Sequence, residues 1–216
     1  MEQKLNYVFV KNFLLNLANT VTQEKDYLNK IDAACGDGDF GVGMYLGFKN
    51  VQKAIEQQRN EDIGALLNTA GYAILSSVGG ASGPLFGTFF IEAGKTASGK
   101  SEIDLKDLSA MFEIALEKIR LRGGAKIGDK TLIDALAPAI ESLKKAAQQK
   151  LDILPALEKA AEAAKEGSES TKELVAKQGK ARYLGQQTLG HIDPGAEVIR
   201  LFFEKLLTVY KYSFLQ

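Results

Sequence analysis

The sequence predicts an all-α fold, and three observations lead to that expectation. Nearly every long segment carries apolar residues at the three- and four-residue spacing of one helix face. Alternating runs of β-branched residues, which are typical of strands, are scarce. Clusters of glycine separate the helical segments at four joints, where the backbone must turn sharply or approach another group closely.

Eight helices are expected along the chain. They cover residues 3–21, 41–58, 62–78, 84–97, 104–121, 131–149, 152–166 and 195–212. The last helix begins with proline at its first position, where a missing amide hydrogen costs nothing. The segment 168–179 reads as a solvated linker with one short helix, because Ser170 and Glu173 have the spacing of a capping box.

Length and charge limit the classes of protein to be considered. The chain has 216 residues, which we expect to form one domain (residues 1–216) with a proper core. Its 27 basic residues balance its 27 acidic residues, so no overall field draws it to nucleic acid or to an anionic membrane. Any anion that it binds must be held locally.

Cysteine and histidine content points to a reducing location. A single cysteine, Cys35, and a single histidine, His191, exclude an internal disulfide framework and a Cys/His metal cluster within one chain. The N-terminal residues mix charge into their apolar positions, so we interpret them as the first helix and not as an export signal. A cytoplasmic location fits these features.

One uncharged run could suggest a membrane span. Residues 63–91 contain no charged residue and exceed the roughly 20 residues that a span requires. The sequence GGASGP at residues 79–84 interrupts this run and leaves two shorter pieces that also carry polar residues. We therefore expect two buried core helices and no membrane span.

Three aspartates with interleaved glycines form the strongest chemical signal. Asp32, Asp37 and Asp39 lie in the segment IDAACGDGDFG, and glycines at 36 and 38 let the chain curl so that the carboxylates converge. Hard oxygen ligands select magnesium or calcium. Three carboxylates leave room for two magnesium ions that share a polyphosphate.

These aspartates have two other interpretations. An EF-hand calcium loop requires glutamate at its twelfth position, but that position holds Gly43 when counted from Asp32 and Phe48 when counted from Asp37. That loop is therefore excluded. An ordinary capped turn stays open, because aspartate is a good N-cap and glycine is common in turns.

The remaining joints are weaker signals. The helix after Asp39 would offer unpaired amides to a phosphate. GGASGP is likewise a glycine turn before a helix, and there the hydroxyl of Ser82 could also donate to a ligand. In GDKTLID, Thr131 and Asp134 have the spacing of a structural helix cap. His191 is expected to be structural or exposed, and a Cys35–His191 nucleophile and base pair has no further support.

Four motifs in order resemble one known family. IDAACGDGDFG, VGGASGPLFGT, RGGAKIGDKTLIDAL and KARYLGQQTLGHIDPGA together resemble the DhaL family, the nucleotide-binding subunits of bacterial dihydroxyacetone kinases. The resemblance covers nearly the whole chain. It implies an antiparallel eight-helix barrel with the nucleotide site at one end.

The resemblance also implies roles for individual residues. It makes Asp32, Asp37 and Asp39 the metal ligands. The implied contacts of the bound ADP or ATP are Phe40, Gly41, Val42, Gly43, Ala81, Ser82, Gly123, Gly124, Leu132, Lys180, Asp193, Pro194 and Gly195. The family often has histidine in place of Phe40 and arginine in place of Lys180. Lysine keeps the positive charge but lacks the planar guanidinium group that can form two parallel hydrogen bonds.

In this family the substrate sits on a separate DhaK subunit, which accounts for the lack of a convincing general base or nucleophile here. The free-standing subunit of the phosphotransferase-system version keeps ADP bound and receives phosphate from a phosphohistidine protein, DhaM. Two alternatives stay open at this point. One is a kinase subunit that exchanges ATP with solution and serves another small ketose; the other is a regulatory adaptor whose nucleotide state controls binding to a transcription regulator.

Overall fold

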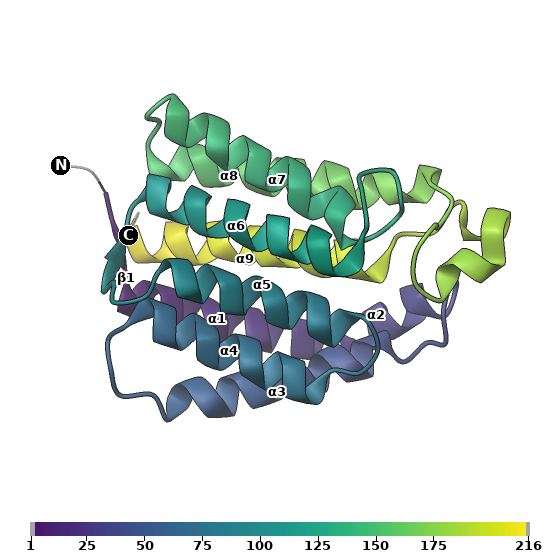
Figure 1. The fold of residues 1–216 in the computed structure, drawn as a ribbon, viewed down its shortest axis with the longest axis horizontal. Helices are drawn as coiled ribbons and strands as arrows, with labels where there is room; N and C mark the ends of the chain where they lie inside the picture. The colour runs from purple at the N-terminus through teal and green to yellow at the C-terminus, as the bar shows by residue number, and fades with distance from the viewer. Residues whose placement is uncertain (1–2, 215–216) are drawn as a thin grey trace.

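The computed structural model describes residues 3–214, and these are almost entirely helical (Figure 1). The α-helices are α1 (Tyr7–Gln23), α2 (Lys25–Asp32), α3 (Phe40–Glu56), α4 (Ile63–Ser77), α5 (Ser82–Thr96), α6 (Leu105–Gly123), α7 (Leu132–Gln148), α8 (Ile153–Ser170) and α9 (Pro194–Phe214). Two 3-10 helices, η1 (Thr171–Glu173) and η2 (Ala181–Thr188), lie between α8 and α9. The strands β1 (Leu5–Asn6) and β2 (Glu102–Ile103) form one short antiparallel pair.

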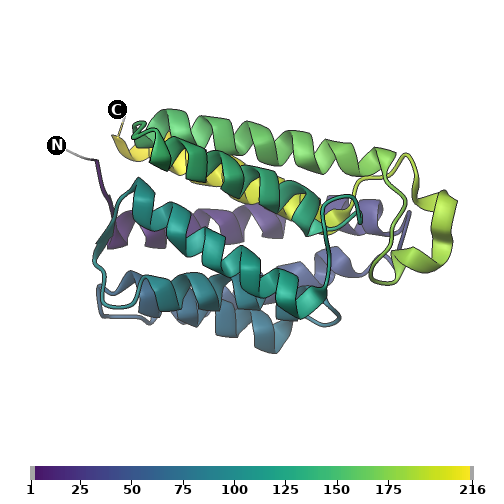
Figure 2. The same cartoon turned by 45° about the horizontal axis from the view of Figure 1, so that its top comes forward.

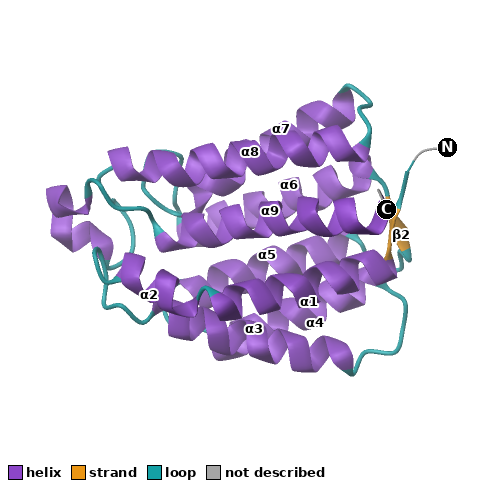
Figure 3. Cartoon of the chain, turned by 180° about the vertical axis from the view of Figure 1, so that it is seen from behind, coloured by secondary structure: helices purple, strands orange, loops and turns teal. Residues whose placement is uncertain are grey.

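Eight of these helices close into a ring. Each helix from α3 to α9 packs against the next one along the chain, and α1 packs against both α3 and α9. Neighbours around the ring run in opposite directions, as the views from front and back show (Figures 1 and 3). The predicted all-α fold, an antiparallel eight-helix barrel, is therefore confirmed. Helix α2 packs on α3 and α9 outside the ring.

The barrel interior is filled by side chains, among which aromatic rings are prominent. The ring of Phe202 in α9 lies 5.0 Å from that of Phe13, 5.5 Å from that of Phe89 and 5.7 Å from that of Phe112, between centroids. These partners come from α1, α5 and α6, so one side chain joins four walls of the barrel. Edge-to-face contacts of this kind add to the stabilisation from burial.

Helices α4 and α5 approach each other unusually closely because glycines face one another along their contact. A β-carbon at Gly64 would lie 2.5 Å from the carbonyl oxygen of Gly94, and one at Gly71 would lie 2.8 Å from that of Gly87. The uncharged run 63–91 thus folds back on itself as two packed helices. Among the described residues, no helix is long and apolar enough to cross a membrane.

The predicted helix boundaries agree with the structure to within a few residues, but two segments differ. Helix α2 was missed, because it has only eight residues and Leu28 alone among them is buried. The interpretation of 168–179 as a solvated linker is wrong at its start, since Ser168 and Thr171 have no exposed surface. The Ser170–Glu173 capping box does not form; the Ser170 hydroxyl donates to the carbonyl of Gly167 instead.

Helix α9 begins with the cap that the sequence indicates. The Asp193 carboxylate accepts the amide of Ala196 at 2.7 Å, and Pro194 occupies the first helical position. Burial raises the pKa of Asp193 to about 7, although the hydrogen bond from Ala196 opposes this shift. A helix cap that carries a proton near neutral pH makes the stability of this end of the barrel depend on pH.

Asp193 should make the protein less stable as the pH rises from about 5 to 8. The folded protein keeps this proton up to about pH 7, whereas the unfolded chain releases it near the usual pKa of an aspartate, about 3.9. The unfolded chain then binds fewer protons over this range, so the free energy of unfolding falls with pH, by at most about 2.7 kcal/mol between pH 5 and 8. Asp193→Asn, which keeps a good N-cap, should flatten that dependence in denaturant titrations at both pH values. An unchanged slope in the variant would contradict this assignment.

Phe202→Ala should destabilise the barrel by about 3–5 kcal/mol, because it removes a ring that is 4% exposed and leaves a cavity among four helices. Chemical denaturation measures the loss. Ile114→Ala, at an α6 position that is 38% exposed, is the control and should change stability by less than about 0.5 kcal/mol. Similar small losses in both variants would show that Phe202 does not join the walls as described.

Candidate functional site

The barrel topology gathers the four glycine joints at one end. In an antiparallel ring, alternate connections lie on the same side, and these are the segments before α3, α5, α7 and α9. The end that carries them is opposite the two termini and the short strand pair (Figures 1 and 2). Segments that are far apart in the sequence therefore meet at one surface.

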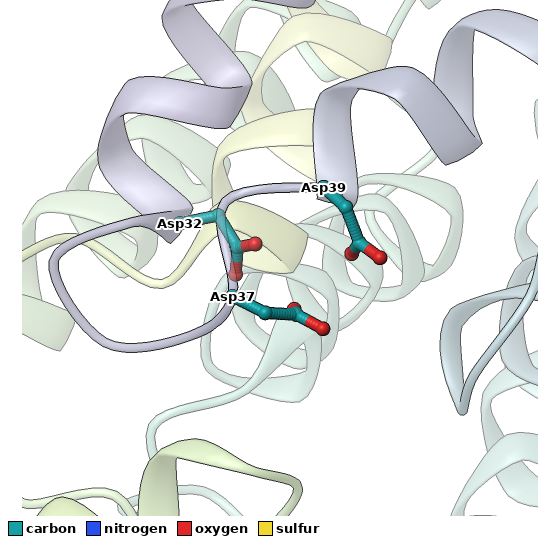
Figure 4. A group of neighbouring side chains, drawn as sticks. All are labelled: Asp32, Asp37 and Asp39. Carbon is teal, nitrogen blue, oxygen red and sulfur yellow. The ribbon is translucent and has the colours of Figure 1, made fainter.

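The three predicted metal ligands converge in the joint between α2 and α3. Asp32 is the last residue of α2, Asp37 lies in the loop and Asp39 precedes the first residue of α3. One carboxylate oxygen from each lies within 4.8 Å of the other two, and the side chains point to a common region (Figure 4). This spacing suits shared coordination of a hard cation.

Glycine is required in this loop. Gly38 has a φ of +75°, a left-handed conformation that other residues rarely adopt. A β-carbon at Gly36 would lie 2.5 Å from the Oδ1 atom of Asp32. The two glycines thus permit the tight path on which the three carboxylates meet, as the sequence pattern predicted.

The carboxylates are not ordinary turn caps alone. Asp39 precedes α3 but makes no side-chain capping hydrogen bond, and its carboxylate points toward those of Asp32 and Asp37 (Figure 4). Asp32 does cap, since its Oδ2 atom accepts the amide of Phe40 at 3.3 Å. Burial raises the pKa of Asp32, and the charges of Asp37 and Asp39 raise it further, although that hydrogen bond opposes them. The cluster therefore has a surplus of negative charge.

Lys180 supplies a cation to this cluster from a distant part of the chain. Its ammonium group forms an ion pair with the carboxylate of Asp37 and lowers the pKa of that carboxyl. Lys180 immediately precedes η2, so the pair connects the carboxylate loop with the segment between α8 and α9. Three carboxylates and one lysine leave a net negative charge, and their oxygen atoms are of the type that binds a divalent cation such as magnesium.

The expectation that the first amides of α3 are available to a phosphate is wrong for most of them. The amide of Phe40 donates to Asp32, that of Val42 donates to the Oδ1 atom of Asn29 at 3.1 Å, and that of Gly43 donates to the carbonyl of Asp39 at 3.0 Å. Helix α2, which the sequence did not reveal, supplies Asn29. The side chain of Phe40 is partly buried and packs against the core.

Gly41 has a packing role at the same place. A β-carbon there would lie 2.1 Å from the carbonyl oxygen of Lys25, so glycine lets α3 pack directly on α2. Gly43 faces the next joint instead, with Val78 3.7 Å from the position of its β-carbon. The start of α3 thus lies between α2 and the turn that precedes α5.

The start of α5 has open amides, whereas most of those at the start of α3 are occupied. Ala81 precedes the helix without a side-chain cap, and among residues 3–214 no acceptor is found for the amides of Ser82 and Gly83. Gly83 is required, because a β-carbon would lie 2.0 Å from the carbonyl oxygen of Val78. Unpaired amides at a helix N-terminus favour an anion.

The joints before α7 and α9 complete this end of the barrel. A β-carbon at Gly123, the last residue of α6, would lie 3.0 Å from the Leu85 side chain of α5, and Gly124 has a φ of +69°. A β-carbon at Gly195 would lie 3.3 Å from the β-carbon of Leu132. Two predicted nucleotide contacts, Leu132 and Gly195, therefore meet directly.

The weaker candidates have structural explanations. Thr131 and Asp134 form the capping box that starts α7. Cys35 is buried, and burial raises the pKa of its thiol, which disfavours the thiolate form that a nucleophile needs. Its sulfur lies 4.0 Å from the carbonyl oxygen of Thr188, whereas the His191 side chain is exposed and its carbonyl oxygen accepts a hydrogen bond from Lys130. The described residues show no Cys35–His191 pair.

Comparison with known proteins agrees with this arrangement. The DAK2 domain model matches residues 34–208, a range that begins two residues after Asp32. The chain is 38% identical to the ADP-binding subunit DhaL of the PEP-dependent dihydroxyacetone kinase of Escherichia coli (strain K12). That similarity covers 94% of this chain and 96% of the relative. The PTS-dependent DhaL subunit of Lactococcus lactis is 34% identical over 88% of this chain and 90% of the relative.

Solved structures with the same fold give a consistent result. The native dihydroxyacetone kinase of C. freundii superposes with a TM-score of 0.74 at 27% identity, over 93% of this chain and 34% of that longer chain. The same kinase in complex with AMP-PNP and Mg2+ superposes with a TM-score of 0.72 over 96% of this chain and 35% of that one. With its fold, its ordered motifs and these relatives taken together, the chain belongs to the DAK2 domain family, which it shares with the DhaL subunits.

Proposed function

We propose that this chain is the ADP/ATP-binding subunit of a dihydroxyacetone kinase. In this proposal residues 1–216 act as one nucleotide-binding domain, and Asp32, Asp37 and Asp39 hold the nucleotide through magnesium. The phosphoryl group passes to dihydroxyacetone held on a separate DhaK-type subunit. The relatives described as ADP-binding subunits, and the neighbouring kinase solved with AMP-PNP and Mg2+, support this function.

The observation that carries the proposal is the convergence of three carboxylates at the same end of the barrel as a helix start with unpaired amides. A nucleotide polyphosphate requires both features, because its negative charge must be neutralised and its oxygens need donors. Magnesium typically binds one or two carboxylates together with substrate phosphates. Three carboxylates therefore support two ions that share one polyphosphate, and we include that number in the proposal.

We propose the following roles for the chain's own residues. Bound magnesium would neutralise the charge that develops on the transferred phosphoryl group. Asp32, Asp37 and Asp39 would hold it, and the free amides at Ser82 and Gly83 would orient phosphate oxygens. Lys180 lies beside the cluster and brings a flexible cation to the same phosphates. The rest of the nucleotide would be enclosed by Gly123, Gly124, Leu132 and the Asp193–Gly195 turn.

Phosphoryl transfer in such a site depends on positioning and charge, so it needs no nucleophile from this chain. We further propose that ADP stays bound and that a DhaM-type phosphohistidine protein of the phosphotransferase system restores ATP in place, in the cytoplasm. The descriptions of the relatives as PEP-dependent and PTS-dependent support this donor. Binding to a transcription regulator stays a prediction from the sequence.

Asp37→Ala should weaken magnesium-dependent ADP binding by about 100-fold or more. Loss of a group that only supports a metal ligand costs up to about 100-fold, and Asp37 is proposed as a ligand itself. Asp37 is exposed and lies in a loop, so circular dichroism should show unchanged helical content. Titration calorimetry with ADP and Mg2+ measures the affinity. Asp26→Ala, which removes an exposed aspartate of α2 outside the cluster, is the control and should bind as the wild type does. Equal ADP affinity in both variants would contradict the metal site.

The purified protein should retain ADP and magnesium through gel filtration. Native mass spectrometry would then show a mass that exceeds the chain by one ADP and its metal ions, and it would count those ions. Tight retention is expected if the nucleotide is recharged in place by a protein donor. A nucleotide that exchanges freely during gel filtration would instead favour the ATP-exchanging kinase subunit.

A further inference from the structure

A lysine to which the motifs above assign no role is buried at the end of the barrel that carries the four joints. Lys130, in the joint before α7, is only 3% exposed. Its ammonium group donates hydrogen bonds to the carbonyl oxygens of Thr171 in η1 and His191 in the joint before α9. One buried cation thus joins three segments that are far apart in the sequence.

The backbone around Lys130 is arranged to turn this side chain inward. Lys130 has a φ of +60°, a left-handed conformation that is unfavourable for a lysine. Asp134, which is 4% exposed, holds the loop on both sides of it: one carboxylate oxygen accepts the amide of Gly128 at 2.6 Å and the other accepts that of Thr131 at 2.7 Å. Strain of this kind persists only where the surroundings fix it.

Thr171 holds the same region from the other side. It has no exposed surface, and its hydroxyl oxygen accepts the amide of Asp193 at 2.9 Å while donating to the carbonyl of Ser168 at 2.6 Å. Lys130 therefore holds the chain at His191, and Thr171 holds it two residues later, at Asp193. The turn that begins at Asp193 then presses against the start of α7, where Gly195 meets Leu132.

Charge argues against a purely space-filling role for Lys130. Burial lowers the pKa of its ammonium group, and the groups that oppose this shift are Cys35, Asp193 and Asp134. An ammonium ion in such surroundings is costly unless it is well bonded, and an apolar side chain of similar volume fills space without that cost. What the ammonium group adds is a pair of directed bonds to the two backbone carbonyls.

On the basis of the nucleotide-binding function proposed above, we propose that Lys130 and Thr171 are positioning residues. They fix the Asp193–Gly195 turn in the form that encloses the nucleoside part of the bound nucleotide. Neither side chain touches the ligand in this proposal. Their loss should therefore weaken binding of ADP more than binding of pyrophosphate, which reaches only the metal ions, Lys180 and the amides at the start of α5.

Lys130→Met and Thr171→Val test this inference, because each keeps side-chain volume and removes the hydrogen bonds. Calorimetry should show Mg2+-dependent ADP affinity reduced about 10- to 100-fold in Lys130→Met, the range found when groups that support ligands are removed. Mg2+-dependent pyrophosphate affinity should stay within about threefold of the wild type, which general damage to the site would not allow. Thr171→Val should show the same selectivity and decides the matter if Lys130→Met does not fold.

Lys177→Met is the matched control. Lys177 is exposed and donates to the carbonyl oxygen of Gly128 at 2.9 Å, so it contacts the same loop without contacting the Asp193–Gly195 turn. This variant should bind both ligands as the wild type does. Hydrogen exchange adds a readout that needs no ligand, since amides of residues 190–196 should exchange faster in the two test variants and not in the control.

The possible outcomes separate this inference from the proposed function. Wild-type ADP affinity in both test variants, or equal losses for ADP and pyrophosphate, would overturn the positioning role and leave the function standing. If the wild type binds no Mg2+-dependent ADP, the proposed function is wrong. Unchanged exchange at residues 190–196 in both test variants would then overturn the proposed hold on the turn as well.

Discussion

The closed antiparallel ring of helices is the constraint on which the rest of the structure depends. Because neighbouring helices alternate in direction, every second connection lies at the same end, and four separate joints meet there. The aromatic cluster around Phe202 joins opposite walls of the ring. The site therefore depends on packing in the barrel interior, although its chemistry resides in loops.

The balance of charge at that end explains how the site is divided among the joints. The loop before α3 contributes negative charge, and its amides are largely occupied by α2 and by the helix itself. The joint before α5 contributes open amides, and the segment before α9 contributes Lys180. In the proposed function, the cation and the phosphate are therefore held mainly by different loops.

Much of this could be predicted from the sequence because the signals are local. Apolar spacing located the eight long helices, and interleaved glycines indicated where Asp32, Asp37 and Asp39 converge. Helix α2 could not be found, because it has only eight residues and buries only Leu28. Its side chain Asn29 then occupied an α3 amide that local reasoning had assigned to phosphate.

The remaining gaps concern contacts between segments that are far apart in the sequence. The pairing of Lys180 with Asp37 spans 143 positions, and no periodicity or spacing predicts it. Burial of Lys130 and Thr171 likewise follows only from how the joints before α7 and α9 pack together. Both segments look polar and solvated when each is considered alone, because their partners become apparent only once the ring is closed.

The most direct measurement is a crystal structure of the protein with Mn2+ and ADP, in which anomalous scattering locates the metal. The account predicts manganese among the carboxylates of Asp32, Asp37 and Asp39, with the polyphosphate directed toward the amides of Ser82 and Gly83. Manganese and nucleotide bound at any other place on the barrel, with the three aspartates uninvolved, would contradict it.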